Sequence, residues 1–295
     1  NYSETYRVDG TVSRTSISWY EGDKRAVDAT GLALVRQDTY KGDLIASEIT
    51  DASTIDNRLL SKTYFAGEEG DEKTNYSETY RVDGTVSRTS ISWYEGNKRA
   101  VDATGLALVR QDTYKGDLIA SEITDASTID NRLLSKTYFA GEEGDEKTNY
   151  SETYRVDGTV SRTSISWYEG NKRAVDATGL ALVRQDTYKG ALEQTEINDA
   201  STIDNRLLSK TYFAGEEGDE KTNYSETYRV DGTVSRTSIS WYEGNKRAVD
   251  ATGLALVRQD TYKGDLIASE ITDASTIDNR LLSKTYFAGE EGDEK

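Results

Sequence analysis

The chain has 295 residues, one fewer than four times 74, and the sequence that begins at Asn1 begins again at Asn75, Asn149 and Asn223. It carries 53 acidic and 36 basic residues, a formal net charge of −17, and its apolar fraction of 35% is low for a domain with one compact core. It contains no His, Cys, Met or Pro, which excludes disulfide frameworks, Cys- or His-based metal sites, and catalysis by a histidine base or a cysteine nucleophile.

The repeat predicts four copies of one unit, at residues 1–74, 75–148, 149–222 and 223–295. The copies follow each other without a Ser- or Gly-rich linker, which favours a continuous array over four separate β-domains on a string. The expected partners are therefore neighbouring copies of the repeat, with self-assembly into filaments. No block of basic residues indicates nucleic-acid binding, and no apolar run approaches the ~20 residues that span a bilayer, so no membrane insertion of this segment is expected.

The first element predicted along each copy is a β-hairpin. Tyr6 precedes the dipeptide Asp9-Gly10, which favours a type I′ turn between paired strands. Residues 11–20 then read as the returning strand, because polar and apolar residues alternate along it. The face expected to be the more buried carries Thr11, Ser13, Thr15, Ile17 and Trp19.

Four segments of each copy end in an aromatic residue followed closely by glycine, and each predicts a strand that ends in a turn. The glycines are Gly10, Gly22, Gly42 and Gly67, and the aromatic residues are Tyr6, Trp19, Tyr20, Tyr40, Tyr64 and Phe65. Stacked copies would bring these rings together as aromatic ladders. These aromatic residues have two possible roles, which are packing in a thin core and forming a stacking platform for glycans.

A short helical turn is predicted between Asp23 and Gly31. Asp23, which is Asn in the later copies, is the candidate helix N-cap, and Gly31 is the candidate residue just after the helix. The next segment, residues 43–58, fits a helix or a strand equally well.

One difference between copies predicts which side chains of that segment are buried. Ile45 is replaced by Glu193 in the third copy, whereas Leu44 and Ile49 are retained as Leu192 and Ile197. A charge is costly in an apolar core, so we expect Ile45 to face solvent and the two retained residues to face inward.

The acidic turn of each copy is a candidate calcium site. Its carboxylates surround a glycine and belong to Glu68, Glu69, Asp71 and Glu72. The spacing is neither that of an EF-hand nor that of calcium-binding β-rolls, so the alternative is a solvated turn whose charges protect sheet edges. No other cofactor is expected.

Each copy also begins with Asn-Tyr-Ser, an acceptor sequence for N-glycosylation at Asn75, Asn149 and Asn223. The alternative is an unmodified strand asparagine. Isopeptide bonds from lysine to Asn or Asp would cross-link an extracellular chain that lacks cysteine, but the sequence alone does not place them.

The segment from Tyr6 to Thr15, YRVDGTVSRT, resembles the YD repeats of the Rhs (rearrangement-hotspot) family, and more broadly the unit resembles arrays in very large bacterial surface proteins. The resemblance covers one ten-residue stretch in each copy, and the 74-residue period is longer than the usual unit. It implies a spiralling antiparallel β-sheet used as an extracellular stalk or as a shell around a toxin.

The sequence thus predicts an all-β, elongated repeat array with short helical turns, either a β-solenoid or a rod made of a spiralling antiparallel sheet. The expected function is a non-catalytic structural segment of a bacterial filament, stalk or adhesin, outside the cell or on its surface. A glycan- or calcium-binding module and a Rhs-like shell are the alternatives. Without a start methionine or atypical end copies, the chain is also expected to be a window from a longer array.

Overall fold

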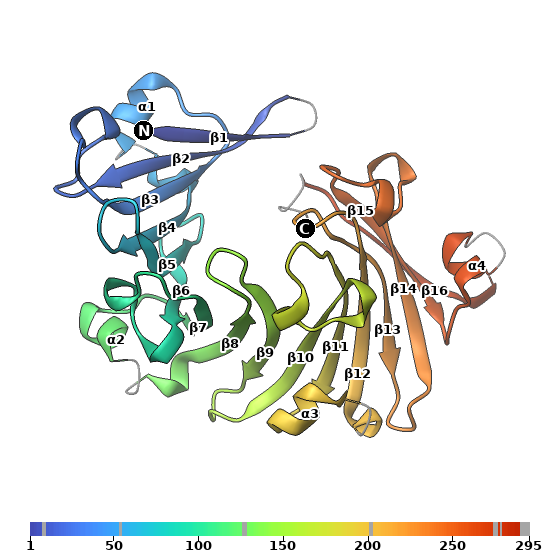
Figure 1. Ribbon diagram of the computed structural model, residues 1–295. Helices are drawn as coiled ribbons and strands as arrows, with labels where there is room; N and C mark the ends of the chain where they lie inside the picture. Colours follow the sequence, from blue (N-terminus) through green and yellow to red (C-terminus); the bar gives the residue numbers. More distant parts are fainter. Residues whose placement is uncertain are drawn as a thin grey trace. The chain divides into compact units, whose positions relative to one another are not determined.

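The computed structural model describes residues 1–7, 10–52, 55–125, 129–200, 203–273, 277 and 279–289. It forms a sheet of 16 strands whose spatial order is their order along the chain (Figure 1). The all-β class is confirmed. Every pairing with a described register is antiparallel, which is one of the two arrangements that the sequence left open beside a β-solenoid. The chain divides into two compact units, residues 1–146 with 153–159 and residues 147–152 with 160–295.

Each unit repeats the same series of strands joined by short helices. The strands of the first unit are β1 (Tyr2–Tyr6), β2 (Val12–Tyr20), β3 (Leu34–Lys41), β4 (Leu59–Ala66), β5 (Lys73–Tyr80), β6 (Val86–Tyr94), β7 (Leu108–Lys115) and β8 (Leu133–Ala140). Strand β9 (Lys147–Tyr154) has residues in both units, and the second unit continues with β10 (Val160–Tyr168), β11 (Leu182–Lys189), β12 (Leu207–Ala214), β13 (Lys221–Tyr228), β14 (Val234–Tyr242), β15 (Leu256–Lys263) and β16 (Leu281–Tyr286).

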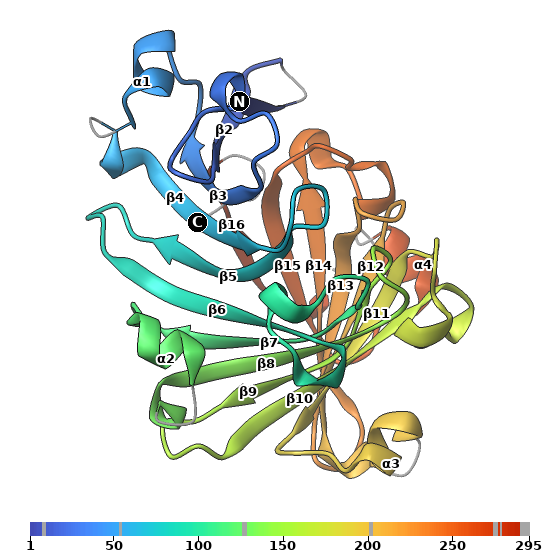
Figure 2. The same cartoon turned by 60° about the vertical axis from the view of Figure 1, so that its left-hand side comes forward.

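Short helices interrupt the two longer connections of each copy, and the α-helices are labelled in Figures 1 and 2. The α-helices are α1 (Ala46–Thr50), α2 (Ala120–Thr124), α3 (Gln194–Asn198) and α4 (Ala268–Thr272). The 3-10 turns are η1 (Ala26–Asp28), η3 (Asp56–Arg58), η4 (Glu95–Asn97), η5 (Ala100–Asp102), η7 (Asp130–Arg132), η8 (Glu169–Asn171), η9 (Ala174–Asp176), η11 (Asp204–Arg206), η12 (Glu243–Asn245) and η13 (Ala248–Asp250). Within the described residues, no helix has both the length and the apolar character needed to cross a bilayer.

All three boundaries between sequence copies fall inside strands, namely β5, β9 and β13. Strand β5 starts at Lys73 and contains the boundary at residues 74–75, and β13 starts at Lys221 and contains the boundary at residues 222–223. Strand β5 pairs with β4 of the preceding copy through partners that include Lys62 and Glu78. The sheet therefore continues from one copy to the next at these two positions.

A β-bulge interrupts every pairing whose register is described. Between β6 and β7, for example, Trp93 pairs with Arg110 and Tyr94 pairs with Leu108, so one residue of β7 is left over. Bulges bend the bulged strand and increase its right-handed twist. The alternation of side chains along β6 itself is preserved, so that residues such as Ile91 and Tyr94 lie on opposite faces of the sheet.

The predicted hairpin is present, but the type I′ turn is wrong. Asp9 lies outside the described residues. In the second copy, the amide of Gly84 donates to the carbonyl oxygen of Arg81 at 2.9 Å. The amide of Arg81 donates to the carbonyl oxygen of Thr85, also at 2.9 Å. Gly84 has φ +79°, whereas Asp83 is not among the residues with positive φ. The hairpin loop is therefore longer than a two-residue type I′ turn and contains a glycine bulge. The Asp83 carboxylate stabilises this loop by accepting the Thr85 amide at 3.0 Å.

The predicted N-cap at Asp23 is also wrong, although a helical turn does follow it. Asp23 and its equivalent Asn97 have φ of +55° and +57° and lie in a tight reversal, and the 3-10 turn begins at Ala26 with Arg25 as its cap. In the second copy, Tyr94 and Lys98 exchange backbone hydrogen bonds across this reversal. Asp and Asn tolerate left-handed backbone better than other non-glycine residues, which explains why this position is Asp or Asn.

The two long connections cover opposite faces of the sheet. On one face, the connection after β7 encloses Ile91 with Tyr114, Leu118, Ile129 and Leu133. On the other face, the connection after β6 encloses Tyr94 with Ala100 and Ala103. The prediction that the face of Thr15 and Ile17 is the more buried is confirmed, because both residues have 0% exposure.

The predictions for residues 44–49 are confirmed as well. Leu44 is buried, Ile45 is 65% exposed, and Ile49 packs half-buried against the core cluster around Ile17. The segment is helical, and the Glu48 carboxylate stabilises the start of α1 by accepting the amide of Ile45 at 3.0 Å.

Candidate functional site

The tryptophan of each copy lies against two guanidinium groups. In the second copy, the guanidinium carbons of Arg99 and Arg110 are 5.1 and 5.0 Å from the centroid of the Trp93 ring. The equivalent pairs flank Trp19, Trp167 and Trp241. Each of these rings therefore takes part in cation–π contacts with two arginines, while the aromatic ladders and the glycan-stacking platform stay predictions.

Arg99 also contacts residues of three different segments, β5, β6 and α2. Besides its contact with Trp93, it donates to the side-chain oxygen of Asn75 at 2.6 Å on β5 and to the carbonyl oxygen of Ile123 in α2. Desolvation lowers the pKa of this guanidinium, which nevertheless stays charged. The sequence showed no sign of this role, because its partners are 24 residues away in either direction.

Replacement of Arg99 by alanine should lower the free energy of unfolding by about 2 kcal/mol, because a cation–π contact and charge-assisted hydrogen bonds are lost together. Arg99→Lys should recover less than half of this loss, since an ammonium cannot serve the three partners at once. Urea unfolding followed by tryptophan fluorescence measures both. Equal stability of Arg99→Ala and the parent chain would contradict this role.

A row of charged side chains crosses three neighbouring strands. Asp38 on β3 lies directly opposite Lys62 on β4, and Lys62 lies directly opposite Glu78 on β5. Asp38 is 3% exposed and Glu78 is 8% exposed. Arg36 donates to Asp38 at 2.9 Å, and the hydroxyl of Tyr80 donates to Glu78 at 2.6 Å. Carboxylates at such depth are stable only when they are hydrogen-bonded or paired.

The same row recurs in the second unit as Asp186, Lys210 and Glu226. Burial raises the pKa of Asp186 and of its counterpart Asp112, while the neighbouring arginine and lysine oppose the rise. Desolvation first, and then Glu226, raises the pKa of the Tyr228 hydroxyl. Burial in this row therefore disfavours the charged forms of these two aspartates and of the Tyr228 hydroxyl.

The remaining predicted aromatic residues are placed in different ways. Tyr64 stacks on Tyr76 at 4.3 Å between ring centroids, and Tyr212 stacks on Tyr224 in the same way. Tyr40 is buried beside Ile17, and Phe65 is half-buried opposite Thr74. Tyr6 is 59% exposed, whereas its equivalent Tyr80 packs against Lys62.

Tyr20 is the last residue of β2. In the later copies, the equivalent tyrosine contacts a strand of the preceding copy. The hydroxyl of Tyr94 donates to the carbonyl oxygen of Thr74 at 2.7 Å, and desolvation raises its pKa to about 12. These tyrosines therefore belong to the packing between copies.

The acidic turn is used for contacts within the protein. The Glu72 carboxylate accepts the amides of Leu34 at 2.9 Å and Gly70 at 3.1 Å. Desolvation raises its pKa, but these bonds together with the backbone of Glu72 itself outweigh desolvation and lower the pKa. The equivalent of Glu69 in the second copy, Glu143, forms an ion pair with Lys73. Within the described part of the chain, no three acidic side chains lie together as a metal site. Glu68 contributes its carbonyl oxygen to the turn, which accepts the amide of Asp71.

The predicted turn glycines have positive φ: Gly10 +82°, Gly22 +71°, Gly42 +73° and Gly67 +129°.

Asn75, Asn149 and Asn223 each accept a hydrogen bond from an arginine at 2.6 Å. These bonds use the side-chain oxygen, whereas a glycan would be attached to the side-chain nitrogen, so glycosylation stays a prediction.

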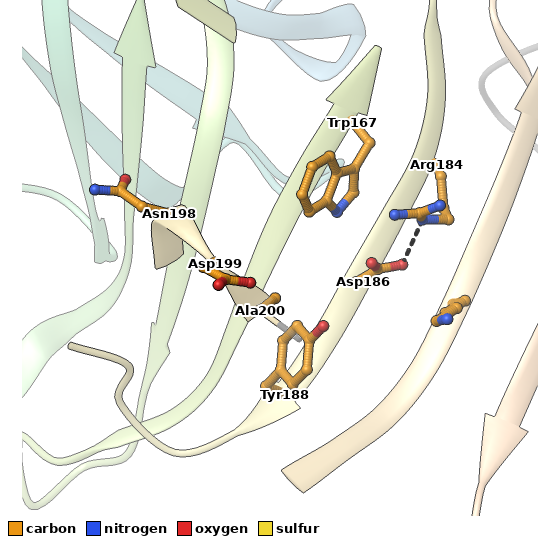
Figure 3. A pocket seen from close by; sticks show the side chains of 8 residues that line it. Trp167, Arg184, Asp186, Tyr188, Asn198, Asp199 and Ala200 are labelled. Carbon is orange, nitrogen blue, oxygen red and sulfur yellow. Dashed lines mark hydrogen bonds and ion pairs between the residues drawn. The ribbon is translucent and has the colours of Figure 1, made fainter. Parts of the chain in front are cut away.

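One pocket of about 260 Å³ opens beside the charged row of the third copy (Figure 3). The strands contribute Trp167, Arg184, Asp186, Tyr188 and Lys210, and the covering segment contributes Asn198, Asp199 and Ala200. Asn198 replaces the threonine of the other copies. The Asp186 carboxyl group faces the pocket between Trp167 and Arg184 (Figure 3), and Lys210 lines the same space.

Comparisons with known proteins assign no family. No family model and no curated protein matches the chain. Among solved structures, a porin-like protein from Bacteroides uniformis is 9% identical, with 90% of this chain and 84% of that chain covered and a TM-score of 0.22. The TcdB2–TccC3–Cdc42 complex is 10% identical, with 88% of this chain but 15% of that chain covered and a TM-score of 0.15. Neither similarity carries an argument about function.

Proposed function

We propose that the chain is a non-catalytic structural segment of a bacterial filament, stalk or adhesin, outside the cell or on its surface. The observation that carries the proposal is that copies join within strands: β5 and β13 contain the sequence boundaries and pair with the preceding strands β4 and β12. An array built in this way can lengthen by addition of copies without linkers. The bulge in each described pairing supports a spiralling sheet as its form.

Contacts between copies support the same proposal. Lys73 donates to the carbonyl oxygen of Leu106 at 2.8 Å and pairs with Glu143, and Lys147 contacts Leu180 and Glu217 in the same way. The Lys73 ammonium also lies 5.3 Å from the ring centroid of Tyr94. Each lysine is largely covered, so these contacts lose less to solvent screening than surface ion pairs do.

A Gly-Ser linker inserted between Thr74 and Asn75 tests the continuity of the array. In a continuous sheet, the insertion interrupts β5 and should remove most of the cooperative unfolding of the first unit, because both strand pairings of β5 are disturbed. The same linker inserted in the exposed hairpin turn after Asp83 is the matched control and should change stability little. Circular dichroism during thermal unfolding measures both.

Independent copies predict the opposite, namely that the linker at the boundary is harmless. Electron microscopy of chains with two, four and six copies tests the stalk itself. Particle length should grow by a constant increment per copy, and compact particles whose diameter grows slowly would reject the proposal.

A further inference from the structure

The row of Asp38, Lys62 and Glu78 combines the groups needed to form a covalent cross-link. We propose that the side chains of Lys62 and Asp38 join in an isopeptide bond, with Glu78 as the proton-transfer group, and that Lys210, Asp186 and Glu226 do the same. Both sets are directly opposed across three strands of a single compact unit. The inference does not depend on the proposed function.

Cross-strand register brings the reacting side chains together. Directly opposed residues have Cβ atoms ~5 Å apart, which the lysine side chain spans with its own length. In the third copy, Lys210 and Asp186 line the same pocket, and the lysine charge opposes the rise in pKa that burial causes at this aspartate.

Burial makes the condensation favourable. In water, an ammonium and a carboxylate are strongly hydrated, and amide formation between them is unfavourable. Asp186 is 3% exposed, and desolvation raises its pKa, so its neutral acid form becomes accessible. The amide that forms carries no charge, which removes the desolvation penalty of an ion pair at this depth.

The bond forms between the lysine Nζ and the aspartate Cγ. A proton first passes from the ammonium to the aspartate carboxylate through the glutamate, which leaves both reactants neutral. The amine then attacks Cγ, the glutamate takes a proton from the nitrogen and returns it to a carboxyl oxygen, and that oxygen leaves as water. One C–N bond forms, one C–O bond breaks, and no oxidant is needed.

The neighbouring residues fit these roles. Arg184 donates to one oxygen of Asp186 at 2.9 Å, and so stabilises negative charge on the oxygen that remains during attack. The hydroxyl of Tyr228 donates to Glu226 at 2.5 Å and holds this carboxylate in the row. Glu226 is 8% exposed, so bulk water does not replace it as the proton carrier.

The fourth copy supplies a matched control within the same chain. Asp260 lies opposite Lys284, but β16 is the last strand of the sheet, and no described strand places a glutamate on the other side of Lys284. Lys284 should therefore remain a free amine.

Intact-mass spectrometry of the purified, unfolded chain tests the proposal. The mass should fall below the sequence mass by one water per bond, with a deficit of at least two waters from the rows of Asp38 and Asp186. Lys210→Arg should remove one water from this deficit, and Glu226→Ala should abolish or strongly slow that loss. Lys284→Arg, as the control, should leave the deficit unchanged.

Peptide mapping of the parent chain keeps the test valid if a variant does not fold. Trypsin should release a branched peptide in which residues 185–189 are joined to the segment that contains Lys210, uncleaved after this lysine. A parent mass equal to the sequence mass, even after long incubation of the folded protein, would overturn the proposal. So would a water deficit that persists when Lys62, Lys210 and their second-copy equivalent Lys136, which lies opposite Asp112, are all arginine, because it would come from another dehydration.

Discussion

Replacement of Ile91 by alanine should lower the free energy of unfolding by about 4 kcal/mol, the largest effect expected for a single substitution in this chain. Ile91 has 0% exposure, as do its equivalents Ile17, Ile165 and Ile239. It lies at the centre of the cluster with Tyr114, Leu118 and Leu133, beneath the segment that carries α2. The surrounding β-strands cannot close in on the cavity, because their backbone hydrogen bonds hold them at the spacing of the sheet.

Urea unfolding measures this loss, and hydrogen exchange locates it. Amide protection should fall in β5 to β8, where the cluster lies. The matched control is Ile119→Glu, which reproduces Glu193 of the third copy at a position where isoleucine is 66% exposed. Its effect should be within about 0.5 kcal/mol. If the two variants are equally stable, the cluster around Ile91 is not the core of this unit.

Replacement of Gly67 by alanine should lower the free energy of unfolding by about 3 kcal/mol, through backbone strain and a steric clash together. Gly67 lies in the turn between β4 and β5 with φ +129°, where a side chain is strained. A Cβ atom there would lie 2.6 Å from the carbonyl oxygen of Asp71 and 3.2 Å from the Cα of Glu72. Both atoms are backbone, so neither can move aside without opening the turn.

Gly70 separates the two contributions, because it lies in the same turn. Its φ is +88°, but a Cβ atom there would meet nothing within 4 Å. Gly70→Ala should therefore show only the conformational penalty, about 1 kcal/mol. Thermal unfolding of the two variants measures the difference. A loss for Gly70→Ala as large as that for Gly67→Ala would show that the clash with Asp71 is unimportant.

Turn conformation was only partly predictable from the sequence. Asp-Gly indicated a hairpin correctly, but the dipeptide also fits a longer loop in which only the glycine is left-handed, as Asp83 and Gly84 show. Asn97 looked like a helix cap because Asn favours caps and left-handed backbone alike. In each case, the choice was made by the strands on either side of the turn.

The sequence by itself determined the repeat, the all-β class and the orientation of Ile45, since these follow from periodicity, from strand and turn residues, and from a charge that a core would not accept. Tertiary structure alone decided the pairing of copies inside β5, the arginines on each tryptophan, and the row of Asp38, Lys62 and Glu78. Strand register is the physical reason. A shift of one residue sends every side chain to the other face, and long-range packing and bulges set that shift.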